Sequence, residues 1–482
     1  MPRLLALLVS LTVAASAQEQ PNVVLIMSDD QGYGDAGYLG HPVLQTPHLD
    51  AMAAAGTELT RFYTHPTCAP SRMSVLTGRH PARSGVWAAR YRGNYRPAEV
   101  TLAEILGARG YRTGLFGKWH LGRPLQDAGD GAPEAGAPDR AAPWTSPDLG
   151  SHTVAPWADG FDTAFTAFSV VPTFDPLVTP PYPDRRYLGD RRPGEPYGVP
   201  YYRKRPGTPV ETLTDGLPGV NAAHIVDAAD SFIREAVAEG APFLAVVWFH
   251  APHRPVVAGP RHRALYGRLS EDDQHWYGAI TAMDEQIGRL RALLREVGVA
   301  EQTVVWFQSD NGPSRCSGIR CAGTTGGLRG RKGSVWEGGI RVPGLVEWPG
   351  RLGEGTVSRV PVTTSDLLPT TLSLLGLTAA DVPEVAGVAL DGIDVWPILT
   401  GAQRARAAPI AFRHYEAWAV VDDDWKLVRP DDGPPRLYDL ARDPGERHDR
   451  SAERPEIAAR LLAWFEGWER SWRSDFFAAA RP

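Results

Sequence analysis

Residues 23–30 read VVLIMSDD, a short apolar run that ends in two aspartates. The same form recurs at 113–120, 243–253 and 303–311, which read TGLFGKWH, FLAVVWFHAPH and TVVWFQSDN. Each apolar run has the length of a strand that is buried on both faces, as in a parallel or mixed sheet. Each run also ends in polar residues, so the sequence predicts that the strands place polar side chains at one edge of a sheet.

Helical patterns lie between these runs, at 49–56, 101–109, 222–238 and 272–297. Alternating strands and helices predict an α/β sandwich with a large mixed sheet flanked by helices. Open α/β sheets bind ligands in the crevice beyond the carboxyl ends of their strands. We therefore expect the polar residues that follow the four strands to share one active site.

The pattern changes twice along the chain. Residues 123–218 are rich in proline, glycine and aromatics, and predict long loops over the site. Beyond about residue 400, short alternating segments predict a small antiparallel sheet followed by a helix. The strands are expected at 410–412, 417–421, 425–428 and 436–438, and the helix at 457–472. We accordingly predict a catalytic α/β domain over 18–400 and a smaller C-terminal unit over 401–482.

Residues 1–17 have the features of a secretory signal peptide. Arg3 supplies a positive start, residues 4–13 are mostly apolar, and Ala15-Ser16-Ala17 offers small residues for cleavage. The apolar stretch is too short to cross a bilayer comfortably, so we expect no stable membrane insertion. The sequence predicts a secreted or periplasmic protein. A net charge of −6 without a long basic run argues against nucleic acid as a partner.

Two polar pairs stand at predicted strand ends: Asp29 with Asp30, and Asp310 with Asn311. Carboxylate and amide oxygens suit Ca²⁺ or Mg²⁺. Neither pair is specific alone, because Asp-Asn-Gly is also a common turn.

Between these pairs, residues 68–78 read CAPSRMSVLTG. Pro70 suits the first turn of a helix, where its missing N–H costs nothing. Cys68 then lies beside the helix N-terminus, where free N–H groups and the helix dipole favour an anionic nucleophile or substrate. Arg72 follows one turn later and is able to reach the same oxygen atoms.

This run resembles the signature of the type I, formylglycine-dependent sulfatases of the alkaline phosphatase superfamily. The resemblance implies an alkaline-phosphatase-like sandwich. It also implies that a formylglycine-generating enzyme oxidises Cys68 to an aldehyde whose hydrate is the nucleophile. In that family one Ca²⁺ is held by residues that match Asp29, Asp30, Cys68, Asp310 and Asn311.

Further motifs extend the resemblance from about residue 21 to beyond 450, and they are most similar to arylsulfatases and N-acetylgalactosamine-6-sulfatases. GKWHLG at 117–122 supplies Lys118 and His120, and PHRP at 252–255 supplies His253. GRKGSVWEGGIRVP at 330–343 supplies Lys332. His250 lies off the motif and is interpreted as structural or a substrate contact. LYDL and DPGE, at 437–440 and 443–446, match a C-terminal family stretch and are interpreted as structural.

The resemblance implies a double-displacement mechanism. One hydroxyl of hydrated formylglycine, bound to Ca²⁺ and supported by Arg72, attacks sulfur while Lys118 holds the sulfuryl group. His253 and Lys332 neutralise or protonate the departing alkoxide. His120 then takes the proton of the second hydroxyl, and sulfate is expelled. A sulfated small molecule or glycan is the expected substrate, with a sulfated carbohydrate favoured because an exported enzyme meets polysaccharides.

Three alternatives stay open. The nearest is a phosphonate or phosphate monoester hydrolase of the same superfamily. A second is a non-catalytic binding protein on the same fold, and a third is a disulfide-stabilised adhesion module. The three cysteines are an odd number for an exported chain. If Cys68 is oxidised, Cys316 and Cys321 are expected to form a local disulfide.

Overall fold

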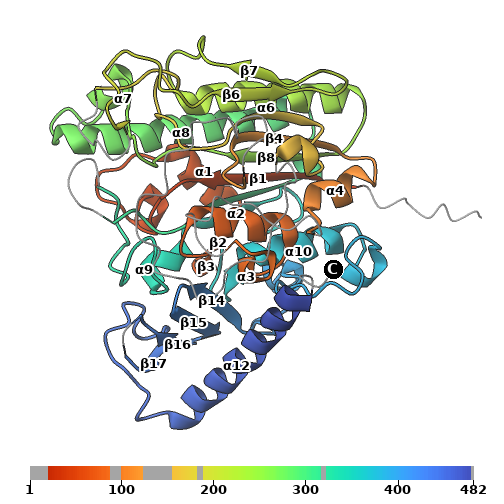
Figure 1. Cartoon of the computed structure of the whole chain (residues 1–482), viewed down its shortest axis with the longest axis vertical. Helices are drawn as coiled ribbons and strands as arrows, with labels where there is room; N and C mark the ends of the chain where they lie inside the picture. The colour runs from red at the N-terminus through yellow and green to blue at the C-terminus, as the bar shows by residue number, and fades with distance from the viewer. Residues whose placement is uncertain are drawn as a thin grey trace, which may run out of the picture.

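The computed structural model describes residues 20–86, 99–122, 155–181, 188–315, 322–431 and 433–478. Its centre is a mixed sheet, which comprises ten strands within these ranges (Figure 1). In spatial order they are β12 (Thr356–Ser358), β2 (Thr57–Leu59), β11 (Gly344–Glu347), β9 (Thr303–Ser309), β1 (Asn22–Ser28), β8 (Phe243–Trp248), β4 (Arg112–Lys118), β5 (Thr163–Ala167), β6 (Tyr201–Lys204) and β7 (Glu211–Leu213).

The four apolar runs form the parallel centre of the sheet. β1 lies between β8 and β9, with Ile26 opposite Val247 on one side and Phe307 on the other. β4 pairs in parallel with the other edge of β8. All residues of β1, β8 and β9 are buried, as expected for strands covered on both faces. The predicted α/β sandwich is confirmed.

Helices cover both faces of the sheet (Figure 1). Val24 and Ile26 of β1 face one layer, whereas Val23 and Leu25 face the other. The first layer contains α1 (Pro47–Ala55), α6 (Asn221–Ala238), α7 (Pro260–Ala264) and α8 (Glu271–Glu296). The second contains α2 (Cys68–Thr77), α3 (Pro81–Ser84), α4 (Leu102–Gly107), α10 (Leu367–Leu374) and α11 (Trp396–Leu399).

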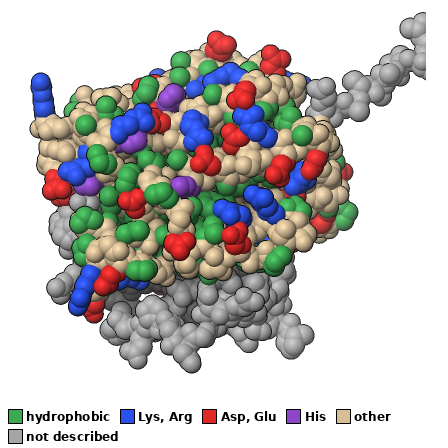
Figure 2. All heavy atoms as spheres, turned by 90° about the horizontal axis from the view of Figure 1, so that it is seen from above, with side chains coloured by type: hydrophobic (Ala, Val, Ile, Leu, Met, Phe, Trp, Pro, Cys, Tyr) green, Lys and Arg blue, Asp and Glu red, His purple; other side chains and the backbone are tan. Residues whose placement is uncertain are grey.

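The expectation of loops over 123–218 is wrong for part of that range. β5, β6 and β7 extend the large sheet there, and the Phe165 ring stacks on Tyr201 at 4.6 Å between centroids. The sequence pattern did not predict these strands because they are short and lie among prolines. Figure 2 looks onto this end of the molecule, where acidic and basic side chains are interspersed. The ion pair between Arg203 and Glu211 is one example.

Two smaller sheets lie below the large one. β3 (Phe62–Tyr63) pairs with β10 (Arg341–Val342) and β13 (Val362–Thr363). The C-terminal sheet is antiparallel and comprises β14 (Ile410–His414), β15 (Ala417–Asp422), β16 (Trp425–Arg429) and β17 (Arg436–Asp439). α12 (Pro455–Ala478) packs on it, with Phe465 stacked on Trp418 at 4.0 Å. The predicted C-terminal sheet and helix are confirmed.

Some expectations are not tested by this structure. The proposed signal peptide, residues 1–17, lies outside the described residues, as do Cys316 and Cys321. The domain division near residue 400 stays a prediction. Among the described residues, no helix has the length and apolar character needed to cross a membrane.

Candidate active site

The carboxyl ends of the four central strands meet at one edge of the sheet, as the sequence predicted. Asp29 and Asp30 follow β1, and Asp310 and Asn311 follow β9. Lys118 is the last residue of β4. Backbone hydrogen bonds lock these ends together, because the Asp310 amide donates to the Ser28 carbonyl at 3.1 Å and Asp29 donates to Ala251 at 2.9 Å.

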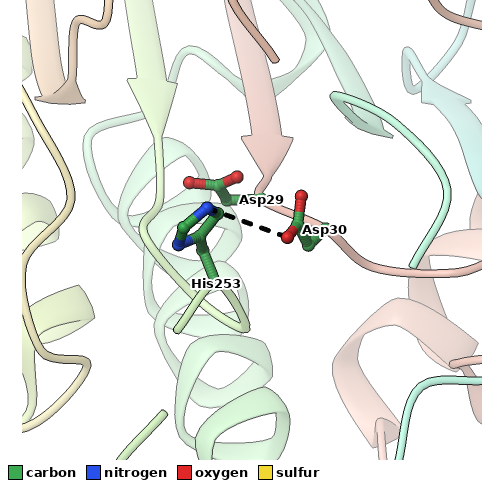
Figure 3. A group of neighbouring side chains, drawn as sticks. All are labelled: Asp29, Asp30 and His253. Carbon is green, nitrogen blue, oxygen red and sulfur yellow. Dashed lines mark ion pairs between the residues drawn. The ribbon is translucent and has the colours of Figure 1, made fainter. Parts of the chain in front are cut away.

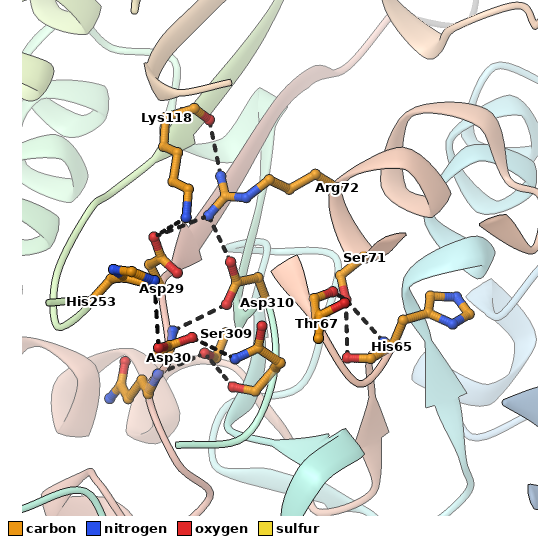
Figure 4. Close-up of polar contacts among 12 residues, drawn as sticks. Asp29, Asp30, His65, Thr67, Ser71, Arg72, Lys118, His253, Ser309 and Asp310 are labelled. Atoms are coloured by element: carbon orange, nitrogen blue, oxygen red, sulfur yellow. Dashed lines mark hydrogen bonds and ion pairs between the residues drawn. The ribbon is translucent and has the colours of Figure 1, made fainter. Parts of the chain in front are cut away.

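Cys68 begins helix α2 and is buried, with 1% of its surface exposed. Ser71 organises this start: its hydroxyl accepts from the His65 amide at 2.9 Å and lies 3.2 Å from the Thr67 carbonyl (Figure 4). Burial raises the pKa of the Cys68 thiol above its usual 9.0, although Lys118 and Lys332 oppose the rise. An unmodified Cys68 is therefore a protonated, weak nucleophile at neutral pH.

Arg72 and Lys118 form a fully buried charge network with two aspartates (Figure 4). The Arg72 guanidinium lies 2.8 Å from Asp310 Oδ2 and donates to the Lys118 carbonyl at 3.0 Å. The Lys118 ammonium lies 2.7 Å from Asp29 Oδ2. Burial and the Asp29 charge raise the pKa of Asp310 to about 6, although Arg72 and Lys118 oppose this. The network thus holds two cations against carboxylates that repel one another.

Asp30 receives the other positive groups of the site. It pairs with the Lys332 ammonium, accepts from Asn311 Nδ2 at 2.7 Å, and lies 3.8 Å from His253 Nε2. Burial alone would raise the pKa of Asp30, but Lys332 and His253 outweigh it and hold that pKa well below 3.8. Asp30 also has φ +66°, a left-handed conformation uncommon outside glycine. This backbone conformation places the Asp30 carboxylate beside Lys332, Asn311 and His253.

These oxygen atoms fit a hard metal ion. Asp29, Asp30 and His253 each offer a ligand atom within 4.8 Å of the others (Figure 3). Within the described part of the chain, Asp29 Oδ1 and Asn311 Oδ1 are buried without a hydrogen-bond partner. Buried polar atoms are nearly always satisfied, so two orphaned oxygens beside clustered carboxylates suit a divalent cation. The sequence analysis assigned His253 only to catalysis, whereas the structure places its ring among the atoms that could bind a metal ion.

Three histidines surround the same centre. The His253 Nδ1 lies 2.6 Å from the Arg254 carbonyl, so Nδ1 carries the proton and Nε2 faces Asp30. Burial lowers the pKa of His253 to about 3, against the opposing pull of Asp30. Burial, Lys118 and Arg72 hold the pKa of His120 well below 6.5, so its imidazole is neutral at pH 7.

His250 is a site residue that the sequence motifs did not identify. Its ring is buried 6.0 Å from Tyr201, and neither ring nitrogen has a hydrogen-bond partner among the described residues. Burial, Lys118 and Arg72 also hold the pKa of His250 well below 6.5. Its position two residues after β8 was the available signal, whereas the family motif contains only His253.

Lys332 lies on a loop that is hydrogen-bonded both to the segment after β9 and to the segment before Cys68. The Lys332 amide donates to the Pro313 carbonyl at 3.0 Å, just beyond Asn311. The Gly333 amide donates to the Pro66 carbonyl at 2.7 Å, just before Cys68. All the residues predicted for the site thus converge on one centre.

A family model described as Sulfatase matches residues 21–377. The chain belongs to the sulfatase family. Arylsulfatase A of Bos taurus is 31% identical, and the match covers 96% of this chain and 89% of that one. N-acetylgalactosamine-6-sulfatase of Homo sapiens is 30% identical, with 93% and 86% covered. Like these relatives, this sulfatase is a sulfuric ester hydrolase.

Solved structures share its fold. The crystal structure of Ps i-CgsB in complex with k-i-k-neocarrahexaose superposes with a TM-score of 0.74 and 26% identity. That match covers 93% of each chain. The alkaline-phosphatase-like fold expected from the motifs is confirmed.

Proposed function

We propose that this sulfatase uses a formylglycine made from Cys68 and one bound Ca²⁺ to hydrolyse sulfate esters of carbohydrates outside the cytoplasm. The observation that carries the proposal is the position of Cys68. It begins a buried helix near the carboxylates of Asp29 and Asp310 and the cations Arg72, Lys118 and Lys332. As a thiol it is a poor nucleophile there, so an oxidised form explains the surroundings better.

Asp29, Asp30, Asp310 and Asn311 would hold the Ca²⁺ together with the oxidised residue 68. The metal would supply positive charge that polarises sulfuryl oxygens and favours an ionised hydroxyl. The aldehyde hydrate at residue 68 would supply one hydroxyl for attack and a second for release of sulfate.

The remaining residues bind the anion and move protons. Arg72 and Lys118 present fixed positive charge from fully buried side chains, where such charge stabilises a developing anion most strongly. His120, neutral at pH 7, is suited to take a proton from the second hydroxyl. Lys332 is assigned to the departing oxygen, which its ammonium neutralises or protonates. His253 is assigned to the same oxygen and acts on it only in its protonated form, because a pKa of about 3 leaves the free imidazole neutral at pH 7. In this proposal, each part of the mechanism has a residue of the site to perform it.

Two observations support a carbohydrate substrate. The structural relative Ps i-CgsB was crystallised with a neocarrahexaose, and the sequence begins with a predicted signal peptide. An exported enzyme encounters sulfated polysaccharides, so a sulfated glycan is the favoured class of substrate.

Mass spectrometry of the peptide that contains Cys68 tests the nucleophile. The protein should be made in a host with a formylglycine-generating enzyme and a control sequence that the host is known to modify. We expect a loss of about 18 Da at Cys68, with the hydrate restoring that mass. An intact thiol beside a modified control would contradict the proposal.

Competing hydrolysis activities separate the remaining alternatives. Turnover of aryl sulfates should exceed turnover of aryl phosphonates and phosphates by the same preparation. A preference for phosphonates would favour the phosphonate monoester hydrolase. Absence of any turnover in modified, metal-loaded protein would favour a binding protein.

A further inference from the structure

A buried ion cluster joins the C-terminal sheet to the loop that carries Lys332. Lys426 of β16 is one of four lysines in the sequence, and its side chain is fully buried. Its ammonium lies 2.8 Å from Glu337 Oε1 and 2.9 Å from Glu446 Oε1. Both glutamates are also fully buried. Glu446 ends the DPGE motif, to which the proposed function assigns no role.

Glu337 is the centre of this cluster. It begins α9 (Glu337–Ile340), five positions after Lys332. Its backbone amide donates to Glu446 Oε2 at 2.7 Å, and Tyr63 donates to its Oε2 at 3.0 Å. Burial alone would raise the pKa of Glu337, but Lys426 and Arg341 outweigh it and lower that pKa. Glu337 is therefore a buried anion whose charge depends on its partners.

The cluster also holds the far side of the Lys332 loop. The Arg329 guanidinium donates to the Glu446 carbonyl at 3.0 Å and lies 3.7 Å above the Trp336 ring. The Arg329 carbonyl in turn accepts from the Gly338 amide at 2.6 Å. Glu446 thus contacts both ends of the segment 329–337, through its carbonyl at one end and its carboxylate at the other.

The backbone of the segment 329–337 is closely packed against the glycines that follow it. A Cβ at Gly339 would lie 2.2 Å from the Ser334 carbonyl oxygen, and one at Gly338 would lie 2.5 Å from the Gly330 oxygen. Since Lys332 lies inside a loop this closely packed, its ammonium position depends on both ends of the loop. Pro313 and Pro66 hold the middle of the loop, at Lys332 and Gly333, whereas Glu446 holds both of its ends.

We propose that Lys426 and Glu446 are positioning residues that set Lys332 against the departing oxygen of the substrate. The C-terminal sheet would then contribute to the chemical step without touching the substrate. This inference rests on the proposed function, and specifically on the assignment of Lys332 to the leaving group.

The dependence of rate on the leaving group tests the inference. Aryl sulfates whose phenols span a range of pKa values would be compared in wild-type protein and in Lys426→Met. A good leaving group such as p-nitrophenol needs little help, so kcat/KM for its ester should fall only a few-fold. For poor leaving groups, kcat/KM should fall about 10-fold to 100-fold, less than the roughly 10²-fold to 10⁴-fold for loss of a proton donor, because the variant displaces Lys332 without removing it. Lys332→Ala should show the same steepening to a larger extent.

A second substitution provides rescue. Lys426→Met leaves Glu337 and Glu446 adjacent without their shared cation. The double variant Lys426→Met/Glu446→Gln removes the second carboxylate and keeps an oxygen for the Glu337 amide. We expect it to recover much of the activity on poor leaving groups, which a merely destabilised protein would not do.

Arg291→Met is the matched control. Arg291 also forms a buried ion pair, with Glu347 at 2.6 Å. Glu347 is paired with Val305, near the start of β9 and away from the site edge. This variant should lose stability but keep the wild-type dependence on the leaving group.

The possible outcomes are distinguishable. Inactive wild-type protein would overturn the proposed function and this inference together. An active wild type with an unchanged leaving-group dependence in Lys426→Met would overturn the inference alone. If Lys426→Met fails to fold, the milder variant Glu446→Gln is measured with the same series of aryl sulfates. A leaving-group dependence like that of wild type in Glu446→Gln would also overturn the inference.

Discussion

At the scale of single residues, Cys68 can be changed with little effect on packing. Serine is nearly isosteric with cysteine, so Cys68→Ser should fold with an unchanged circular dichroism spectrum. Its turnover of an aryl sulfate should fall at least about 10³-fold, because serine lacks the second hydroxyl that releases sulfate. Sulfate release measured by ion chromatography checks this. Full activity in the variant would contradict the mechanism.

The clustered carboxylates predict a strong response to metal. Asp29, Asp30 and Asp310 repel one another in a buried site, and a divalent ion would relieve that repulsion. Ca²⁺ at 100 times its dissociation constant should stabilise the fold by about 2.7 kcal/mol. Thermal unfolding with a chelator, and after addition of Ca²⁺ or Mg²⁺, measures the effect. Asp310→Asn should weaken the response, and a midpoint that ignores the metal would exclude a site here.

Most of the site was predictable because its residues lie in contiguous motifs directly after strongly apolar strands. His250 was named from the sequence as structural or a substrate contact, but the lack of partners for its ring nitrogens among the described residues was not predictable, because a sequence does not show hydrogen bonds of a buried ring. The contact between His253 and Asp30 was also hidden, since it joins loops 223 residues apart in the chain. The roles assigned to these side chains stay predictions.

At the scale of elements, β4 depends on a glycine immediately before Lys118. Gly117 has φ +108°, and a Cβ there would lie 1.8 Å from the Trp248 carbonyl oxygen of β8. Gly117→Ala should therefore destabilise the fold by about 3 kcal/mol or more, since backbone must move. Gly240→Ala is the control, because Gly240 also has positive φ but nothing lies within 4 Å. It should cost about 1 kcal/mol in urea unfolding. Equal losses in the two variants would refute the clash.

The contact between α1 and α8 predicts a pH dependence. Asp284 of α8 accepts from the backbone amides of His48 and Leu49 at 3.0 and 2.8 Å. Burial nevertheless raises the pKa of Asp284 from 3.8 to about 7. The folded state thus holds its proton more tightly, so this group's contribution is full below pH 3.8 and is lost as pH rises towards 7.

Asp284→Asn removes that titration. Between pH 4 and 7 the variant should lose less unfolding free energy than wild type, by up to about 1.4 kcal/mol per pH unit. Urea unfolding across this range measures the two slopes. Parallel slopes would show that Asp284 is ionised in the folded protein.

The elements that sequence patterns predicted are those with strong periodicity. α6 and α8 run 18 and 26 residues, and their apolar stripes are clear. β3, β10 and β13 have only two residues each, too few for any alternation to be visible. Such short strands owe their geometry to neighbours that are distant in the chain, not to local preference.

At the scale of the whole molecule, the predicted division near residue 400 can be tested by truncation. Tyr63, Val335 and Ile340 of the larger part pack in one apolar cluster with β14, β15 and β16. A chain of residues 18–400 would expose this cluster and leave Glu337 without Lys426. We expect it to aggregate and to lack activity, as measured by size-exclusion chromatography and sulfate release. A monomeric, active fragment would show that the two parts are independent.

The burial of Cys68 also has a consequence for timing. With 1% of its surface exposed, at the start of a helix whose every residue is buried, Cys68 is out of reach of another enzyme once folding is complete. A distant part of the chain packs nearby: Trp468 of α12 packs on His80, twelve positions after Cys68. Under the proposed function, an enzyme that oxidises Cys68 would therefore have to act before the chain has folded. We expect a variant that folds faster to bury Cys68 earlier, to carry less of its oxidised form and therefore to be less active.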